Sequence, residues 1–436
     1  MALNEYHLAD IFKDYHYLSF AKKIKMKANT FNCNIRSLFS IMAIASVMAF
    51  PVQAQDAPLL DENGNPAGFQ TLELGAQAPD FDLPGIDGRN YTLADFDDAD
   101  VLMVLFTSNH CPTSHAIEKR LQKLIADYIS QSFAIVAINP NHPDGLQLDE
   151  LGFGEFNDSY EDMKPYADLN GWEFPYIYDG ETQQTARAYG CLATPHVFLF
   201  DKKRRLQYAG RFDDSRYEPE HTVTSHDARN ALEDLFAGRE VTVPRTRPHG
   251  CSTKWREKRI RIAAAMESWT NLPVSIEKID TDGIAALRAN ATSHYRLFNI
   301  WATWCVPCVE EFPELVAISR QFDMRGFDFI TISLDDPKQE PQALAFLKRH
   351  GVGPTDRALK RIHKDNRKTN HYLYSGTSQD ALATVLDTEW PGPVPHTVLV
   401  APGGDIVWRH NGVIDGQEAR SQIAEALTRY WELPAK

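Results

Sequence analysis

One arrangement of residues occurs twice along this 436-residue chain and constrains the fold more than any other feature. In each copy an apolar run of strand type leads into a short turn that contains cysteine, and a helical stretch follows. A second apolar run comes next, and much later a Pro-His pair leads into a third. Strands that alternate with helices predict βαβ units around a largely parallel sheet. The sequence therefore predicts two α/β domains in tandem.

The two copies have nearly the same spacing. Pro195 follows Cys111 by 84 residues, and Pro395 follows Cys308 by 87 residues. We predict a first domain at 73–256 and a second at 257–436. The expected strand, turn, helix, second strand and third strand lie at 101–106, 108–111, 115–129, 133–139 and 197–200 in the first copy, and at 295–301, 304–308, 310–322, 327–334 and 397–400 in the second.

The segments outside this pattern receive separate predictions. The polar stretch 55–72 is predicted to be a linker. Residues 254–269 have helical periodicity with a basic face and are expected to bridge the domains. Residues 275–280 are predicted to be the first strand of the second domain, and 282–290 a short helix. The polar stretch 354–385 is predicted to be an irregular insertion that forms a substrate-facing flap.

The first 54 residues have the pattern of a secretory signal peptide. The uncharged apolar run 38–50 follows several lysines and Arg36, and small residues come after it at 52–54. This run is shorter than the roughly 20 residues of a membrane span, and an uncleaved anchor is the alternative. A start at Met26 would give a signal peptide of ordinary length. We therefore expect an exported, periplasmic protein whose mature chain begins near Gln55.

Net charge and cysteine content exclude two classes of protein. The formal net charge is -14, from 45 Lys and Arg against 59 Asp and Glu. An acidic protein repels phosphate backbones, so no nucleic-acid partner is expected. Six cysteines are too few for a scaffold built on disulfides. Five of them follow the predicted signal peptide, and their positions indicate the chemistry.

Residues 301–308 (Trp-Ala-Thr-Trp-Cys-Val-Pro-Cys) form the strongest motif in the chain. A strand delivers Cys305 to the start of a helix, where unpaired N–H groups and the helix dipole stabilise a thiolate. Cys308 lies one turn later. Cys305 is therefore predicted to attack a disulfide, and Cys308 to resolve the mixed disulfide. The alternatives are a structural disulfide or half of a zinc site, and the chain has no second CxxC to complete a zinc site.

The second domain resembles the exported TlpA-like branch of the thioredoxin superfamily over roughly residues 272–434. The resemblance implies a thioredoxin fold with Pro395 as a cis-proline beside the CxxC. It also implies that the backbone of Val394 pairs with an extended substrate. Asn299 stands where thioredoxin has a buried Asp, so the proton acceptor has to come from elsewhere. His396 is a candidate because histidine titrates near neutrality, and a purely structural loop histidine is the alternative.

The first domain resembles the AhpC/TSA peroxiredoxin and redoxin family over roughly residues 73–256. Ser108 stands where related Cys-Asn-His-Cys turns have their first cysteine. The active turn is therefore predicted to be SxxC, with Cys111 as its thiol. The resemblance rests on residues 75–84 (Gly-Ala-Gln-Ala-Pro-Asp-Phe-Asp-Leu-Pro), 106–112 (Phe-Thr-Ser-Asn-His-Cys-Pro), 194–196 (Thr-Pro-His) and 250–255 (Gly-Cys-Ser-Thr-Lys-Trp).

This resemblance implies peroxide chemistry at Cys111. A thiolate at the start of a helix attacks a peroxide and becomes a sulfenic acid, which another thiol resolves. Ser108 is predicted to donate a hydrogen bond to the thiolate or the peroxide. Thr194 and Pro195 are expected to form the cis-proline edge that binds substrate. A remnant thiol in a binding domain is the alternative for Cys111.

Two features weaken the peroxidase interpretation. Peroxiredoxins have a proline where this chain has Val104. The activating arginine of the family has no clear counterpart, and Arg120 and Arg211 are the options.

Two cysteines are candidates to resolve Cys111. Cys191 lies four residues before Pro195, at a position expected to face the core, where a small hydrophobic role is the alternative. Cys251 lies beyond the last predicted helix of the domain, at 227–237. It is expected either to fold back toward Cys111 or to meet the second domain.

A metal site in the first domain is the remaining alternative there. His110, Cys111 and His115 are close in sequence, and His196 is expected to face the same turn. Copper-handling members of the superfamily carry two cysteines in this turn, whereas this chain has one. We therefore expect neither a metal nor another cofactor.

Together these features predict an exported thiol–disulfide oxidoreductase with two tandem thioredoxin-like folds. The expected partners are protein or small-molecule disulfides, peroxides at the first domain, and an upstream membrane thiol reductant. Cys305 is expected to reduce the product formed at Cys111. The alternatives are a thiol peroxidase with a built-in reductase domain, two independent sites, and a metal- or haem-delivery chaperone on the same scaffold.

Overall fold

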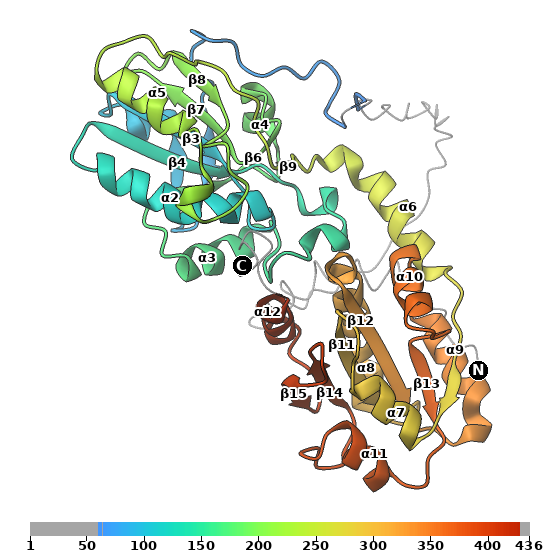
Figure 1. Ribbon diagram of the computed structural model, residues 1–436. Coiled ribbons are helices and arrows are strands. Elements are labelled where there is room, and N and C mark those ends of the chain that lie inside the picture. The colour runs from blue at the N-terminus through green and yellow to red at the C-terminus, as the bar shows by residue number, and fades with distance from the viewer. Residues whose placement is uncertain (1–59, 63, 428–436) are drawn as a thin grey trace, which may run out of the picture. The chain divides into compact units, whose positions relative to one another are not determined.

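The computed structural model describes residues 60–62 and 64–427 (Figure 1). The predicted signal peptide, the alternative start at Met26 and the beginning of the predicted linker lie outside the described residues. Within the described part, none of the helices is both long and apolar enough to cross a bilayer. Two central sheets organise this part of the chain.

The first sheet has five strands in the order β5-β4-β3-β7-β8. Strands β3, β4 and β5 are parallel, whereas β7 and β8 run antiparallel to their neighbours. All residues of β3 are buried, which explains why its sequence is apolar throughout. The strands are β3 (Val101–Phe106), β4 (Phe133–Asn139), β5 (Tyr176–Tyr178), β7 (His196–Phe200) and β8 (Leu206–Gly210).

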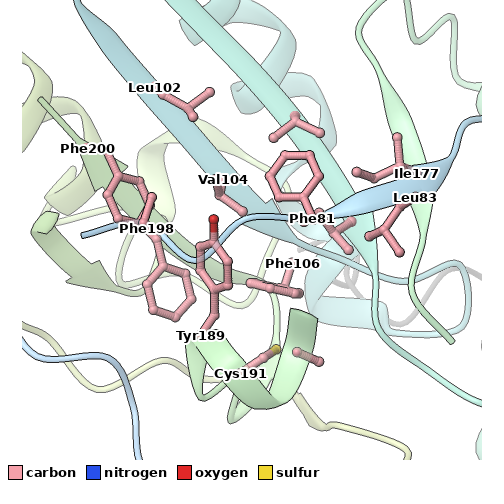
Figure 2. Packing of buried hydrophobic residues seen from close by; sticks show 14 of the residues in the cluster. Phe81, Leu83, Leu102, Val104, Phe106, Ile177, Tyr189, Cys191, Phe198 and Phe200 are labelled. Atoms are coloured by element: carbon pink, nitrogen blue, oxygen red, sulfur yellow. The ribbon is translucent and has the colours of Figure 1, made fainter. Parts of the chain in front are cut away.

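Alternate residues of β3 enter two cores on opposite faces of this sheet. Leu102, Val104 and Phe106 belong to one hydrophobic cluster, shown in Figure 2. Met103 and Leu105 belong to the other, as the alternation of side chains along a strand requires. The helices of this domain are α2 (Pro112–Tyr128), α3 (Tyr160–Leu169), α4 (Gln184–Tyr189) and α5 (Asp227–Phe236), and β1 (Asp82–Pro84) pairs with β2 (Asn90–Thr92) in a separate small sheet.

The second sheet has six strands in the order β10-β13-β12-β11-β14-β15. The first four are parallel and the last two antiparallel. Phe298 and Ile300 of β11 face one cluster, and Leu297 faces the other. The elements are β10 (Glu277–Ile279), α7 (Thr281–Arg288), β11 (Tyr295–Trp301), α8 (Val306–Gln321), β12 (Phe327–Ser333), α9 (Glu340–Arg349), β13 (His371–Tyr374), β14 (His396–Val400), β15 (Ile406–Asn411) and α12 (Gly416–Ala426).

The stretch 354–385 forms regular structure, so the prediction of an irregular flap is wrong. It contains α10 (Asp356–Lys364), strand β13 and α11 (Gln379–Leu386), and β13 lies inside the sheet between β10 and β12. Ala358 and Ile362 are the buried residues of α10, so its apolar face is too narrow to stand out from its polar composition. The four residues of β13 are too few for a clear alternation of apolar and polar residues.

Part of the predicted linker packs against the first domain. The ring of Phe69 lies edge-on to the buried ring of Trp255, with the two centroids 5.4 Å apart. The helix predicted at 254–269 is present as α6 (Arg259–Thr270). The predicted limits of the two domains stay predictions.

Candidate functional site

The CxxC turn begins helix α8. Cys305 caps this helix and is joined to Cys308 by a disulfide. The backbone N–H of Cys308 donates a hydrogen bond to Cys305 Sγ over 3.3 Å. Pro307 lies in the first turn of the helix, where its missing N–H leaves no partner unpaired. The Cys305 sulfur therefore occupies the positive end of the helix, which stabilises a thiolate in the reduced form.

The two sulfurs of this turn differ in access. Cys305 is 5% exposed and Cys308 is fully buried. The neighbouring Trp304 and Val306 are 62% and 66% exposed, which is unusual for large apolar side chains. Exposed apolar residues around a reactive group are typical of a protein contact surface. Of the two cysteines in this turn, Cys305 alone has exposed surface.

A buried aspartate fixes the loop that leads to Cys305. Asp335 accepts hydrogen bonds from the backbone N–H of Thr303 over 3.0 Å and from its hydroxyl over 2.6 Å. The Ser333 hydroxyl donates to the same carboxylate over 2.7 Å. These bonds hold the connection between β11 and α8 in one conformation. The sequence analysis did not identify Asp335.

A second buried acid, also missed from the sequence, lies one turn beyond Cys308. Glu311 is 3% exposed, and its carboxylate accepts hydrogen bonds from Asn299 Nδ2 and from the backbone N–H of Ile414, each over 2.9 Å. Burial raises the pKa of Glu311 to about 7, although these two hydrogen bonds oppose the shift. The missed signal was an acidic residue on the face of α8 that carries Phe312 and Leu315 into the core.

The peptide bond between Val394 and Pro395 is cis. The carbonyl oxygen of Pro395 accepts a hydrogen bond from the N–H of Gly412 over 2.9 Å. Val394 itself is half-buried, and among the described residues it takes part in no strand pairing. The backbone edge beside the CxxC turn is therefore not paired with another strand of the described chain.

His396, the predicted acid–base candidate, is engaged elsewhere. Its Nδ1 is hydrogen-bonded to Asn411 Oδ1 over 2.8 Å, and its Nε2 lies 3.2 Å from an Asp387 carboxylate oxygen. Its ring stacks on Trp390 with centroids 5.1 Å apart. Burial lowers the pKa of His396, although both polar partners oppose the shift. These contacts favour the structural alternative for His396 and leave Glu311 as the better candidate for proton exchange.

The strand registers align the turn of the first domain with the CxxC. Phe106 pairs with His196, and Ile300 pairs with His396, each directly after its cis-proline. Five residues further along, Cys111 caps α2 just as Cys305 caps α8.

Ser114 therefore stands where the second domain has Cys308, and the first turn is CxxS. The prediction of an SxxC turn is wrong. It relied on the resemblance to Cys-Asn-His-Cys turns, in which the two cysteines would stand at positions 108 and 111. The sheet register measures position in the fold, and it places Ser108 three residues ahead of the reactive position.

Cys111 lies inside the protein with no exposed surface. Its Sγ is 3.0 Å from the carbonyl oxygen of Thr194, which accepts the thiol hydrogen. The backbone N–H of Cys251 donates to the same sulfur over 3.3 Å. Burial opposes ionisation, but the Cys251 thiol, the charge of His110 and the backbone N–H of Ser114 hold the pKa of Cys111 well below its usual range.

His110 forms a buried ion pair beside this thiol. Its Nδ1 lies 2.6 Å from Asp158 Oδ2, and both side chains are fully buried. Asp158 also accepts hydrogen bonds from the backbone N–H of Asn109 over 2.8 Å and from Asn141 Nδ2 over 2.6 Å. Burial raises the pKa of Asp158, but the charge and hydrogen bonds of His110 lower it more, so that the net shift is downward. The sequence analysis named His110 only as a metal ligand and missed Asp158.

The predicted substrate edge of the first domain is occupied by the chain itself. The peptide bond between Thr194 and Pro195 is cis. Strand β6 (Ala193–Thr194) pairs antiparallel with β9 (Cys251–Ser252), so that Thr194 lies opposite Cys251. Figure 1 shows these two short strands side by side. The Ser108 hydroxyl shares a hydrogen bond with the Thr194 hydroxyl over 2.8 Å. This contact is to the cis-proline edge, whereas the prediction was a hydrogen bond to the thiolate or the peroxide.

The two candidate resolving cysteines are clearly separated. Cys191 lies in the hydrophobic cluster of Figure 2 with Phe106 and Tyr189. Burial raises the pKa of Cys191 to about 12, which favours the packing role. Cys251 is half-buried, and its thiol interacts with that of Cys111, which together with burial holds the pKa of Cys251 well above its usual range. Fold-back toward Cys111 is therefore the geometry observed for Cys251.

Neither candidate arginine takes part in this site. Arg120 Nε donates to Asp213 over 2.7 Å, and Arg211 Nε donates to Asp227 over 2.7 Å. Neither contact includes Cys111. These two ion pairs remove the support that a peroxidase interpretation would draw from Arg120 or Arg211.

The histidines proposed as metal ligands have other partners. His110 pairs with Asp158, and His115 lies 3.1 Å from Glu118. His196 accepts a hydrogen bond from the backbone of its own loop, and burial lowers its pKa to about 3. Across residues 60–62 and 64–427, no three or more His, Cys, Asp or Glu side chains are grouped so that they could hold a metal ion.

The curated relatives are thiol–disulfide exchange proteins. The chain is 25% identical over 148 residues to the thiol–disulfide oxidoreductase ResA of Bacillus subtilis, which covers 34% of this chain and 68% of ResA. It is 28% identical over 134 residues to the thiol:disulfide interchange protein DsbE of Allochromatium vinosum, covering 31% and 60%. The match with DsbE thus spans less than two thirds of that relative's length.

Two solved structures share more identical residues with the chain. A hypothetical protein of Sinorhizobium meliloti is 37% identical over 43% of this chain and 97% of its own, with a TM-score of 0.38. An uncharacterized protein of Geobacillus kaustophilus is 35% identical over 43% and 94%, also with a TM-score of 0.38.

Family matches cover both domains. Residues 74–209 match the AhpC/TSA family, and residues 272–427 match the Redoxin family. These matches agree with the two sheets and with the thiol–disulfide exchange relatives. The chain therefore belongs to the thioredoxin superfamily, as an oxidoreductase with two redoxin-type domains in tandem.

Proposed function

We propose that the chain is an exported thiol–disulfide oxidoreductase that exchanges disulfides at Cys305 and Cys308. One observation carries the proposal: a helix-capping cysteine that is 5% exposed lies between the exposed Trp304 and Val306, with a fully buried cysteine one turn behind it. The first domain, at 73–256, is proposed to carry a second and separately controlled thiol at Cys111.

The reaction proceeds by two exchanges in the reduced protein. The Cys305 thiolate attacks one sulfur of a client disulfide, which forms a mixed disulfide and releases the other client sulfur as a thiolate. Cys308 then loses its proton and attacks Cys305 Sγ. This releases the second client thiolate and leaves the Cys305–Cys308 disulfide. Two electrons pass from the protein to the client, and the released thiolates take up protons.

We assign the proton exchange of Cys308 to Glu311. A carboxyl group with a pKa of about 7 is present in both protonation states at neutral pH. Glu311 follows Cys308 by one helical turn, and its hydrogen bonds to Asn299 and Ile414 fix its position. Asn299 occupies the strand position of the aspartate in thioredoxin, so the acid is supplied by the helix.

Client recognition is proposed to use the backbone edge at Val394 and Pro395. The exposed Trp304 and Val306 supply apolar contacts beside it. Such a surface fits an extended protein segment that carries a disulfide, and small-molecule disulfides would bind it less tightly because they make fewer of these contacts.

Export to the periplasm and reduction by an upstream membrane thiol reductant complete the proposal. The basic and apolar pattern before residue 55 supports export. A thiol reductant in an oxidising compartment needs a continuing supply of electrons.

A trapping experiment tests the proposal. Cys308→Ser blocks the second exchange, so a disulfide client that is added to the reduced variant should accumulate as a mixed disulfide on Cys305. Peptide mapping identifies the linked cysteine. Cys191→Ser is the matched control because it removes a buried thiol of the core, and it should leave client reduction intact. If the trapped adduct forms elsewhere, or if Cys308→Ser reduces clients at the normal rate, the proposal fails.

A thiol peroxidase reaction at Cys111 is the second candidate function. The lowered pKa of Cys111 and the adjacent Cys251 thiol favour it, because a sulfenic acid at Cys111 would condense with Cys251 to a disulfide and water. Complete burial of Cys111 and the engagement of both arginines elsewhere count against it. Peroxide consumption that is lost in Cys111→Ser but retained in Cys305→Ser with an added reductant would establish this activity.

A further inference from the structure

Strand β9 occupies the position that an extended substrate takes in the proposed mechanism of the second domain. Strand β9 lies antiparallel to β6, and β6 ends directly before the cis-proline Pro195. We propose that the Thr194 edge binds an extended cysteine-containing peptide, that residues 250–252 are its built-in occupant, and that Cys251 closes a reversible disulfide with Cys111. The inference concerns the first domain and does not rest on activity at Cys305.

The contacts of Cys111 place the occupant directly on the reactive sulfur. The N–H of Cys251 donates to Cys111 Sγ, and the carbonyl oxygen of Thr194 lies 3.0 Å from the same atom. A client cysteine paired with Thr194 would lie where Cys251 lies now. The segment therefore presents its thiol to Cys111 in the way that a bound client would present its disulfide.

Buried residues after the strand fix one end of this segment. Trp255 is fully buried, its Nε1 donates to Asn65 Oδ1 over 3.3 Å, and the Arg187 guanidinium lies 4.9 Å from its ring centroid. The backbone N–H of Lys254 donates to Asn141 Oδ1 over 2.8 Å. Cys251 thus stays tethered close to Cys111 even when β9 leaves the edge.

Gly250 lets the segment approach the edge closely. A Cβ atom at this position would lie 2.0 Å from the carbonyl oxygen of Thr194 and 2.7 Å from its carbonyl carbon. Neither backbone atom can move aside as the end of a flexible side chain would. Any residue other than glycine at 250 therefore has to push the segment away from Thr194.

Closure of the disulfide balances with a disulfide as oxidant. The Cys111 thiolate attacks a client disulfide, forms a mixed disulfide and releases one client thiolate. Cys251 then loses its proton and attacks Cys111 Sγ, which releases the second client thiolate. The pair loses two electrons, the client gains them, and the Cys251 proton passes to a released thiolate. Ser114 cannot perform this second step because it carries no thiol.

Access follows from burial. Cys111 has no exposed surface while β9 is in place, so a client has to displace residues 250–252 before Cys111 can attack. Departure of the occupant uncovers the Cys111 sulfur, beside which the charge of His110 and the backbone N–H of Ser114 remain. Its return with Cys251 resolves the mixed disulfide.

The first test asks whether Cys251 resolves Cys111. The reduced full chain with Cys305→Ser and Cys308→Ser is incubated with glutathione disulfide and mapped without reduction. We expect a Cys111–Cys251 cross-link, and with Cys251→Ser added we expect a stable glutathione adduct on Cys111. An adduct on Cys111 that persists in the presence of Cys251 would overturn the proposal, as would a cross-link of Cys111 to Cys191.

The second test asks whether residues 250–252 limit access. In the chain with Cys251→Ser, Cys305→Ser and Cys308→Ser, the Gly250→Ala variant should raise the rate of maleimide labelling at Cys111 by at least about tenfold, which corresponds to roughly 1.4 kcal/mol. Gly238→Ala is the control, since Gly238 also has a positive φ but no atom within 4 Å of its Cβ position. Equal labelling rates in the two variants would overturn the proposal. Because Cys305 and Cys308 are replaced in both tests, failure here leaves the proposed function untouched.

Discussion

The two reactive turns occupy the same place in their sheets but meet the surroundings in opposite ways. Cys305 touches the surface between exposed apolar residues, whereas Cys111 is sealed beneath β9. The residue before each cysteine shows the same contrast. Trp304 is 62% exposed, and His110 is a buried ion-pair partner. The fold fixes where the sulfur lies, and the flanking residues decide what can reach it.

Substitutions at equivalent positions extend the contrast into the core. Where the second domain has Cys308, the first has Ser114, so its resolving thiol has to come from outside the turn. Where α8 has the ionisable Glu311, α2 has the apolar Ile117. The second domain keeps its proton exchange and its partner thiol inside the turn. The first domain obtains the thiol from a strand 140 residues away.

The largest expected effect separates the two thiols in catalysis. Cys305→Ser should lower the rate of client disulfide reduction by at least about a thousandfold, because the covalent route is lost. Cys111→Ser should change that rate by less than about twofold if the sites act independently. Turnover of a disulfide client with excess reductant measures both. A large loss in Cys111→Ser would show that the sites work in series and would support the expected relay between them.

The buried ion pair of the first site should matter for stability. Asp158→Asn leaves His110 without its charge partner and should lower the free energy of unfolding by roughly 3 kcal/mol or more. The control is Asp168→Asn, which breaks an exposed pair with Lys164 and should cost less than about 1 kcal/mol. Urea unfolding of the oxidised protein compares the two. Similar losses in both variants would contradict the contrast between the sites.

The buried acid of the second site should make stability depend on pH. The Glu311 pKa rises from 4.5 to about 7 on folding. The unfolded state therefore loses this proton first, and stability falls as pH rises from about 4.5 to 7, by about 3 kcal/mol for this group. Glu311→Gln should remove that part of the dependence. The measurement is the unfolding free energy at pH 5 and pH 8, with Ile117→Val as a control that should leave the slope unchanged.

The smallest expected effect tests the register between the turns. Ser114→Cys places a thiol where the second domain has its resolving cysteine, so part of the Cys111 disulfide should shift to position 114 after mild oxidation. Ser108→Cys should not capture Cys111, although the SxxC alignment would favour it. Peptide mapping of the oxidised proteins distinguishes the two. Capture at position 108 in preference to 114 would overturn the assignment of the turn as CxxS.

The sheets were predictable because one central strand is a continuous apolar run and the other is apolar except for Arg296 and Asn299. The run at 101–106 matches β3, and the run at 295–301 matches β11. Strand β13 was not predictable because it has only four residues and is defined by its pairing with β10 and β12. Local patterns reveal an element when its own residues bury both of its faces.

The candidate site was predictable only where its residues are neighbours in sequence. Cys305 and Cys308 lie in one local motif, and Cys111 lies in another, at the start of α2. Asp158 lies 48 residues from His110, and the approach of Cys251 to Cys111 depends on the path of a long loop. Glu311 was close in sequence, but its role depends on which face of α8 is buried.

The buried Trp255 anchors the short tether that holds residues 250–252 at the first site. Three residues lie between Cys251 and Trp255, so the Cα of the freed Cys251 stays within about 14 Å of the Trp255 Cα. At that range the occupant competes at an effective concentration on the order of millimolar. Residues 250–252 therefore displace a weakly bound client before exchange is complete, whereas a client that binds the Thr194 edge tightly remains. Because the tethered segment competes for the Thr194 edge, the first domain selects clients by their residence time there.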